Sequence, residues 1–226
     1  MDALNRFIDH TLLAPTATAD DLTRLCAEAR AHDFFAVCVN SAWVSTAADE
    51  LRGSGVKVAS VIGFPLGAQL SASKAAESQF ALEAGATELD LVIALGPLLA
   101  GDDAYVRADV AAVVTLAKAF DSSILVKVIL ETAVLSDEQI VRACELAREA
   151  GADFVKTSTG ALDKKLALPG RATGATPDVV ALMRQAVGDA LGVKASGGIE
   201  TRAQAEALIA AGATRIGTSH GVALLS

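Results

Sequence analysis

Cysteine and histidine are both scarce in this chain, which has three of each among 226 residues. The cysteines are Cys26, Cys38 and Cys144, and the histidines are His10, His32 and His220. The cysteines are too few and too scattered for a disulfide framework or a zinc site, and the histidines do not have the spacing of metal ligands. We therefore expect no metal centre, structural or surface roles for the histidines, and a buried, inert thiol at Cys38.

Basic residues are fewer than acidic ones, with 19 Lys and Arg against 27 Asp and Glu. The formal net charge is -8, which argues against nucleic acid as the main partner, although a small phosphorylated molecule needs only a local cluster of donors. No uninterrupted apolar stretch is long enough to span a bilayer, and no basic, apolar leader precedes the first elements. These features predict a soluble, cytoplasmic protein without a membrane partner. With 52% hydrophobic and 20% charged residues, the chain can build a large core.

Strand and helix patterns alternate along the whole chain. Apolar runs predict strands at Phe7–Leu12, Phe34–Asn40, Val56–Gly63, Thr87–Ile93, Ile124–Leu130, Asp153–Lys156, Gly192–Gly198 and Thr214–Thr218. Helical patterns fall between them, at Thr18–Ala31, Trp43–Leu51, Ser71–Glu83, Leu98–Phe120, Ser136–Gly151, Thr176–Val187 and Thr201–Ala211. Such alternation implies a parallel sheet, either closed as a barrel or open and doubly wound. No glycine-rich dinucleotide fingerprint follows an early strand, so we predict an α/β fold with a single (β/α)8 TIM barrel domain over residues 1–226.

Four successive strands of the predicted barrel carry a charged residue inside an apolar run. These residues are Asp90, Lys127, Lys156 and Lys194. Lys156 and Lys194 lie on adjacent strands about 4.8 Å apart, so inward-facing side chains would bring their ammonium groups together. Two such neighbouring charges disfavour each other, and a neutral amine would then be available near neutral pH. A neutral amine can attack an aldehyde or ketone to form an imine, with Asp90 as the acid and base.

A structural explanation competes with this catalytic one. A single lysine of this kind is better explained by a buried ion pair or a salt link at the barrel rim. Three lysines and an aspartate on consecutive strands favour catalysis, because the desolvation of so many charges often outweighs their mutual attraction.

Glycines follow the last strands of the predicted barrel, where a phosphate is often bound. Gly197 and Gly198 follow the seventh strand, Gly217–Ser219 close the eighth, and Gly160 lies beyond the sixth. Glycine lets the backbone N–H groups approach an anion closely. Together these positions predict a phosphate cradle.

The sequence segments at the predicted strands resemble those of the deoxyribose-phosphate aldolase family. The matching phrases are Ile8-Asp-His-Thr-Leu-Leu13, Val37-Cys-Val-Asn40, Val61-Ile-Gly-Phe-Pro-Leu-Gly-Ala68, Glu88-Leu-Asp-Leu-Val-Ile93, Val126-Lys-Val-Ile-Leu-Glu-Thr132, Phe154-Val-Lys-Thr-Ser-Thr-Gly160, Val193-Lys-Ala-Ser-Gly-Gly-Ile199 and Arg215-Ile-Gly-Thr-Ser219. They cover nearly the whole chain in order, one phrase for each strand. The resemblance implies a cofactor-free class I aldolase, a lyase that reversibly cleaves 2-deoxy-D-ribose 5-phosphate to D-glyceraldehyde 3-phosphate and acetaldehyde.

The same resemblance implies roles for particular residues. Lys156 matches the lysine that forms the Schiff base, Lys194 matches a second lysine that perturbs it, and Asp90 matches the acid and base. Supporting polar residues of the site would be Asp9 and Lys127, and Cys38 would lie at the edge of the substrate pocket. The phosphate would be bound by Gly160, Gly197, Gly198 and Ser219. Family members commonly form homodimers, some form tetramers, and they serve deoxynucleoside catabolism.

Two departures from the family pattern stand near the phosphate side. His220 replaces a second serine that often follows Ser219, and the loop Ala161–Ala175 looks longer than usual and adds Lys164, Lys165 and Arg171. The loop is either a lid over the anion or a solvated surface loop. Two alternative functions therefore stay open, namely another imine-forming sugar-phosphate aldolase or transaldolase, and a non-catalytic sugar-phosphate-binding barrel.

Overall fold

Eight parallel strands close into a barrel in the computed structural model, which describes residues 4–226. The strands are β1 (Ile8–Leu12), β2 (Ala36–Val39), β3 (Lys57–Ile62), β4 (Glu88–Val92), β5 (Leu125–Ile129), β6 (Phe154–Lys156), β7 (Gly192–Ser196) and β8 (Arg215–Thr218). They pair in chain order, and β8 pairs with β1 to complete the circle. The predicted barrel is confirmed, with strand ends that differ from the predicted ends by at most two residues.

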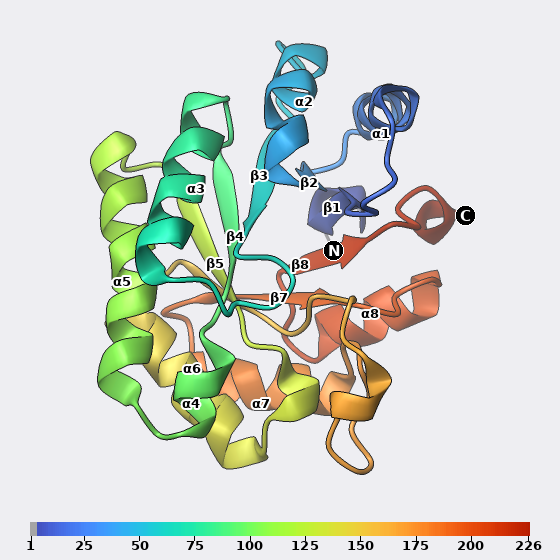
Figure 1. Ribbon diagram of the computed structural model, residues 1–226. Coiled ribbons are helices and arrows are strands. Elements are labelled where there is room, and N and C mark those ends of the chain that lie inside the picture. The colour runs from blue at the N-terminus through green and yellow to red at the C-terminus, as the bar shows by residue number, and fades with distance from the viewer. Residues whose placement is uncertain (1–3) are drawn as a thin grey trace.

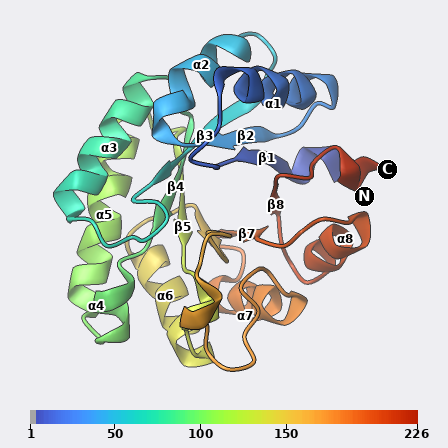
Figure 2. The same ribbon diagram turned by 45° about the vertical axis from the view of Figure 1, so that its right-hand side comes forward.

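Helices surround the barrel and follow the strands in sequence (Figures 1 and 2). The α-helices are α1 (Ala19–Ala31), α2 (Val44–Glu50), α3 (Ser71–Glu83), α4 (Leu95–Leu99), α5 (Asp103–Phe120), α6 (Asp137–Glu149), α7 (Pro177–Val187) and α8 (Arg202–Ala210). Short 3-10 helices are η1 (Leu4–Phe7), η2 (Ser41–Trp43), η3 (Thr132–Val134), η4 (Lys164–Leu166) and η5 (Ala223–Leu225).

The predicted helix Leu98–Phe120 is in fact two helices, α4 and α5. The chain turns at Gly101, whose φ of 75° lies in the left-handed region that glycine adopts most easily. Asp102 then caps α5, and its side chain accepts a hydrogen bond from the backbone N–H of Tyr105. The glycine followed by a capping aspartate was the local signal for this break.

Capping side chains fix the starts of the helices that the sequence marks most clearly. Ser136 and Gln139 form the expected reciprocal capping box of α6, and Thr201 and Gln204 form another at α8. Thr176 caps α7 just before a proline in its first turn. Because these caps end the loops that follow β5, β6 and β7, they also fix where those loops lie over the barrel.

The two faces of the barrel strands differ sharply in chemistry. Apolar side chains such as Val37, Leu89 and Val126 belong to the large core cluster between strands and helices. Alternate residues point into the barrel, and several of these are charged and fully buried, including Asp90 and Lys194. The inside of a TIM barrel is ordinarily filled by branched apolar side chains. In this protein a network of charged side chains fills much of that space. The network holds the side chains of the candidate site in place.

Within residues 4–226, no helix is long and apolar enough to cross a membrane.

Candidate active site

Asp90 lies at the centre of a cluster of three lysines inside the barrel. The Nζ atoms of Lys156 and Lys194 each lie 2.8 Å from Oδ2 of Asp90, and Nζ of Lys127 lies 2.7 Å from Oδ1. The strand register explains the meeting, since Asp90 is paired with Lys127 and Lys156 with Lys194. Lys156 and Lys194 therefore lie close together as predicted, and both contact the same oxygen of Asp90.

A second set of buried charges lies against this cluster. Arg215 donates hydrogen bonds to both Asp9 and Glu88, and the guanidinium lies 3.8 Å from the centre of the Phe35 ring. Lys127 contacts Glu88 at 2.6 Å, and Lys194 contacts Asp9. The two sets are therefore one continuous network of ionic contacts.

The sequence interpretation missed Glu88 and Arg215 as members of this network. The signal for Glu88 was available, because it stands two residues before Asp90 on the same strand and must share its face. Arg215 opens the last strand of the barrel and is 3% exposed. Its long side chain reaches carboxylates on β1 and β4, and that partnership cannot be recognised from the local sequence.

Cations outnumber carboxylates in this network. Lys127, Lys156, Lys194 and Arg215 face Asp9, Glu88 and Asp90, so the fully charged set would carry a net charge of +1. A buried net charge is costly, and loss of one proton from a lysine would relieve it. Two of the three lysines nevertheless keep their protons, because, although burial opposes their charged form, the neighbouring carboxylates raise the pKa values of Lys127 and Lys194.

The direction of the pKa shifts separates the roles of these groups. Burial alone would raise the pKa of Asp90, but Lys127, Lys156 and Lys194 hold that pKa well below its usual range. Burial likewise opposes the charged form of Lys194, yet the carboxylates of Asp9 and Asp90 raise its pKa. The sequence analysis expected one amine of the Lys156–Lys194 pair to lose its charge. Lys194 is not that amine, because two carboxylates hold it.

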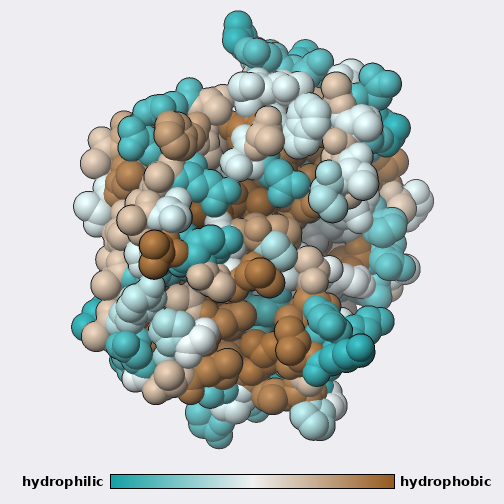
Figure 3. Space-filling model, viewed as in Figure 1, coloured by the Kyte–Doolittle hydropathy of each residue, from teal (hydrophilic) through white to brown (hydrophobic). Residues whose placement is uncertain are grey.

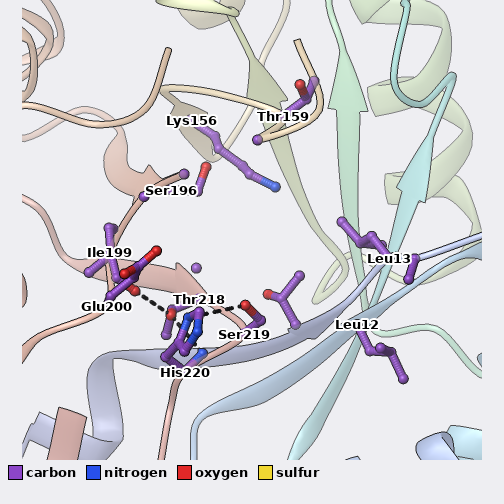
Figure 4. A pocket seen from close by; sticks show the side chains of 16 residues that line it. Leu12, Leu13, Lys156, Thr159, Ser196, Ile199, Glu200, Thr218, Ser219 and His220 are labelled. Carbon is purple, nitrogen blue, oxygen red and sulfur yellow. Dashed lines mark hydrogen bonds between the residues drawn. The ribbon is translucent and has the colours of Figure 1, made fainter. Parts of the chain in front are cut away.

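A cavity of about 360 Å³ opens at the carboxyl ends of the strands beside Lys156 (Figure 4). Five of the predicted site residues line it, namely Lys156, Gly160, Gly197, Gly198 and Ser219. In Figure 4 the Lys156 side chain extends into the open space between the segments that carry Ser196, Ser219 and Leu13. The predicted amine and the predicted phosphate cradle therefore border one cavity.

Other predicted residues lie beneath the cavity without lining it. Asp90, Lys194, Lys127 and Asp9 are fully buried and reach the cavity only through Lys156 and the ionic network. Cys38 is also fully buried, with Sγ 3.8 Å from Oδ2 of Asp90, and it does not form the pocket edge that was expected of it. Burial and the nearby Asp90 charge raise the pKa of the Cys38 thiol.

Within the described chain no group of three or more His, Cys, Asp or Glu side chains is arranged to hold a metal ion.

His220 borders the same cavity and is exposed. Its backbone N–H donates to Oγ1 of Thr218, and its Nδ1 atom lies 3.3 Å from the hydroxyl of Ser219. The imidazole therefore stands beside the predicted phosphate cradle, where it contacts one of its hydroxyl groups.

Glu131 is a further buried acid, behind the cavity lining, that the sequence interpretation did not single out. Its φ of 56° is left-handed, which is uncommon for a residue other than glycine. Its Oε2 atom accepts hydrogen bonds from the backbone N–H and the hydroxyl of Thr159, a residue that lines the cavity. Burial raises the pKa of the Glu131 carboxyl. Its place directly after the fifth predicted strand was the signal that could have identified it.

Comparison with known proteins gives a consistent result. The family described as DeoC/LacD family aldolase matches residues 5–226. A deoxyribose-phosphate aldolase from Clostridium botulinum (strain Loch Maree / Type A3) is 50% identical over 222 residues, covering 98% of this chain and 99% of its own length. Another from Brevibacillus brevis is 52% identical over 223 residues, covering 99% of this chain and 95% of its own.

A solved structure with the same architecture is that of the deoxyribose phosphate aldolase from Aeropyrum pernix, described as a unique tetramer. It superposes with a TM-score of 0.87 and is 38% identical, over 98% of this chain and 89% of that one. Likeness of this extent covers every strand that carries a site residue. The chain belongs to the DeoC/LacD family of aldolases.

Proposed function

We propose that the protein is a Schiff-base aldolase that reversibly cleaves 2-deoxy-D-ribose 5-phosphate to D-glyceraldehyde 3-phosphate and acetaldehyde. The observation that carries the proposal is that Lys156 lines the cavity, whereas Lys127 and Lys194 lie fully buried beneath it and contact the same carboxylate. The similarity to deoxyribose-phosphate aldolases supports the choice of substrate.

Lys156 is the proposed nucleophile. Its neutral amine attacks the aldehyde carbon C1, and the carbonyl oxygen takes up a proton to give a carbinolamine. Loss of water then leaves a protonated imine between Nζ and C1. Because Asp90 lies 2.8 Å from Nζ, it can accept the proton that the amine releases and return a proton to the departing hydroxyl group. Lys194, held charged by Asp9 and Asp90, supplies a fixed positive charge next to these steps.

Bond cleavage uses the imine as an electron sink. The hydroxyl on C3 loses its proton and becomes the aldehyde of glyceraldehyde 3-phosphate, while the C2–C3 bond breaks and its electron pair moves to C2. The resulting enamine takes up a proton at C2, and water hydrolyses the new imine to release acetaldehyde and the free amine. The phosphate would be bound by the backbone at Gly160, Gly197 and Gly198 and by the hydroxyl of Ser219, which border the same cavity as Lys156.

Borohydride trapping tests this mechanism directly. Hydride reduces an imine to a stable secondary amine, so acetaldehyde and borohydride together should leave an N-ethyl group on Lys156, located by peptide mass mapping. The adduct should be absent in Lys156→Ala, and the intact protein should release acetaldehyde from 2-deoxyribose 5-phosphate. An adduct on Lys194 or Lys127 would show that the roles are assigned wrongly. Folded protein that forms no adduct would instead be a sugar-phosphate-binding barrel.

We also propose that the protein assembles as a homodimer. Large exposed apolar side chains follow the barrel strands at their carboxyl ends, among them Leu66, Leu70, Leu99 and Leu166. Figure 3 shows apolar surface gathered on this view of the molecule over α4 and the segment that contains η3. Exposed apolar area of this kind is commonly covered by another protein surface. Light scattering on the purified protein tests the proposal, and the mass of a monomer across micromolar concentrations would contradict it.

The proposed location is the cytoplasm, where a phosphorylated sugar would be available as substrate. All three cysteines are buried and free, which suits a reducing compartment. Fractionation of cells that express the tagged protein would test this.

A further inference from the structure

The loop between β6 and α7 crosses the proposed phosphate segment at close range. At this crossing Gly174 packs against the backbone of Gly197: a methyl group on Gly174 would lie 2.2 Å from the carbonyl oxygen of Gly197 and 2.6 Å from its carbonyl carbon. The next residue, Ala175, donates its backbone N–H to the carbonyl oxygens of Ser196 and Gly197, at 3.1 and 3.2 Å. The contact therefore joins two backbone segments, and it includes no side chain that could rotate away to make room.

The same loop also meets Gly197 at its other end. A methyl group on Gly197 would lie 3.0 Å from the Cα atom of Gly174, 3.5 Å from the Cβ atom of Ser158 and 3.7 Å from the Cα atom of Gly160. Gly197 and its neighbour Gly198 both have positive φ, at 90° and 71°. This glycine pair has no side chains to hold its conformation, so the flanking loop contacts fix it.

Ser196, the residue before this glycine pair, has other support: its backbone N–H donates to the Thr157 hydroxyl, and its own hydroxyl donates to the carbonyl oxygen of Ser158. Gly197 and Gly198 border the cavity that holds Lys156, and they also border a second cavity of about 590 Å³ under the loop. Lys164 and Arg171 line that second cavity. Because the glycine pair has open space on both sides, its position depends on the contact of Gly197 with Gly174 and Ala175.

The β6–α7 loop is itself anchored to other parts of the barrel, which limits its movement away from Gly197. The backbone N–H of Leu168 donates to the carbonyl oxygen of Ala133, and Arg171 forms an ion pair with Asp137 at 2.5 Å. Beyond Ala175, Thr176 caps α7. An added atom at Gly174 would therefore displace Gly197 rather than the loop.

We propose that Gly174 is a positioning residue that sets the shape of the Ser196–Gly198 segment and thereby the preference of the enzyme for phosphorylated over unphosphorylated sugars. The inference rests on the proposed aldolase function. It adds that selectivity for the phosphate depends on a residue of the β6–α7 loop that does not itself line the cavity beside Lys156.

The experiment compares Gly174→Ala with the unaltered protein on 2-deoxyribose 5-phosphate and on 2-deoxyribose. We expect the KM for the phosphorylated sugar to rise about tenfold, the effect of losing one hydrogen bond to a charged group. We expect kcat/KM for 2-deoxyribose to change little, because it makes no phosphate contact. Trapping of acetaldehyde on Lys156 should also be unchanged. Gly96→Ala is the matched control, since nothing lies within 4 Å of the added methyl group there.

Two further measurements keep the inference open to refutation. Calorimetric titration with inorganic phosphate should show weaker binding in Gly174→Ala, and this readout does not depend on turnover. Ala175→Pro removes the N–H that bonds to Ser196 and Gly197 and places a ring carbon against the same two carbonyl oxygens, so it should show the same selective loss.

The outcomes separate the inference from the function on which it rests. An unchanged KM and unchanged phosphate binding in Gly174→Ala would overturn the inference. Equal losses on both sugars together with a lower Tm would do so as well, because they indicate general damage to the fold. Absence of turnover and of a trapped adduct in the unaltered protein would count against the aldolase function itself, whatever the phosphate titration gives.

Discussion

Lys156 and Lys194 both direct their ammonium nitrogens at the same atom, Oδ2 of Asp90, each at 2.8 Å. Although they share this oxygen, the two lysines lie at different depths in the ionic network. Lys194 also contacts Asp9 and has no exposed surface, whereas Lys156 lines the cavity. One lysine is therefore held as a fixed cation while the other borders the cavity, and Asp90 lies within hydrogen-bond distance of both.

Asp90→Asn tests this arrangement. The amide keeps the shape of the carboxylate but can neither accept the proton of the amine nor balance three neighbouring cations. We expect kcat to fall by roughly 10²–10⁴-fold, the usual contribution of a positioned acid or base. Steady-state kinetics with 2-deoxyribose 5-phosphate measures it, and circular dichroism checks that the variant is folded. Turnover within a few fold of the unaltered protein would show that protons move by another route.

Lys74 and Asp109 make a second buried ion pair, and neither residue lines the cavity. Their side chains have no exposed surface and join α3 to α5 at 2.6 Å, and the Lys74 ammonium also donates to the carbonyl oxygen of Val92. In Lys74→Met the carboxylate of Asp109 would lose its cation while remaining buried. We expect the free energy of unfolding to fall by about 3–5 kcal/mol, measured by urea denaturation.

The half-exposed pair Arg202–Glu206 on α8 is the matched control for this experiment. Arg202→Met should change stability little, because water screens and solvates the partner that remains. If Lys74→Met were as mild as Arg202→Met, the buried pair would contribute nothing beyond its packing.

The sequence predicted the barrel well because each strand is a short apolar run and each joint carries turn or capping residues. It also predicted that Lys156 and Lys194 would meet, since strand parity and neighbouring strand order determine this. It could not reveal Arg215 as a partner of Asp9, because the two residues are 206 positions apart and only barrel closure brings them together. Lys74 was missed for a similar reason, as its partner Asp109 comes from a different helix.

The three cysteines should resist alkylation in the folded protein. Burial raises the pKa of Cys26 to about 11 and that of Cys144 to about 12, and burial together with the charge of Asp90 raises the pKa of Cys38. A thiolate is the reactive form, so each shift slows the reaction. At pH 8 we expect iodoacetamide to add no mass to the native protein and three carbamidomethyl groups after unfolding in urea. Selective modification of Cys38 in native protein would show that it is accessible from the cavity.

Acid should destabilise the protein through the carboxylates of the network, and Asp9 allows the sign to be worked out. Burial opposes the charge of Asp9, but Arg215 and Lys194 lower its pKa from 3.8 to about 2. A carboxyl with a lower pKa in the folded state stabilises that state fully above pH 3.8 and loses this contribution as the pH falls towards 2.

The free energy of unfolding should accordingly fall between pH 5 and pH 2, and Asp9→Asn should be less stable than the unaltered protein at pH 5. The gap between them should narrow on acidification, because the protonated Asp9 of the unaltered protein also loses its charge. Urea denaturation at several pH values measures both, with Asp49→Asn as a control for the loss of one negative charge at the surface. A gap that stays constant down to pH 2 would mean that Asp9 contributes through packing rather than through its charge.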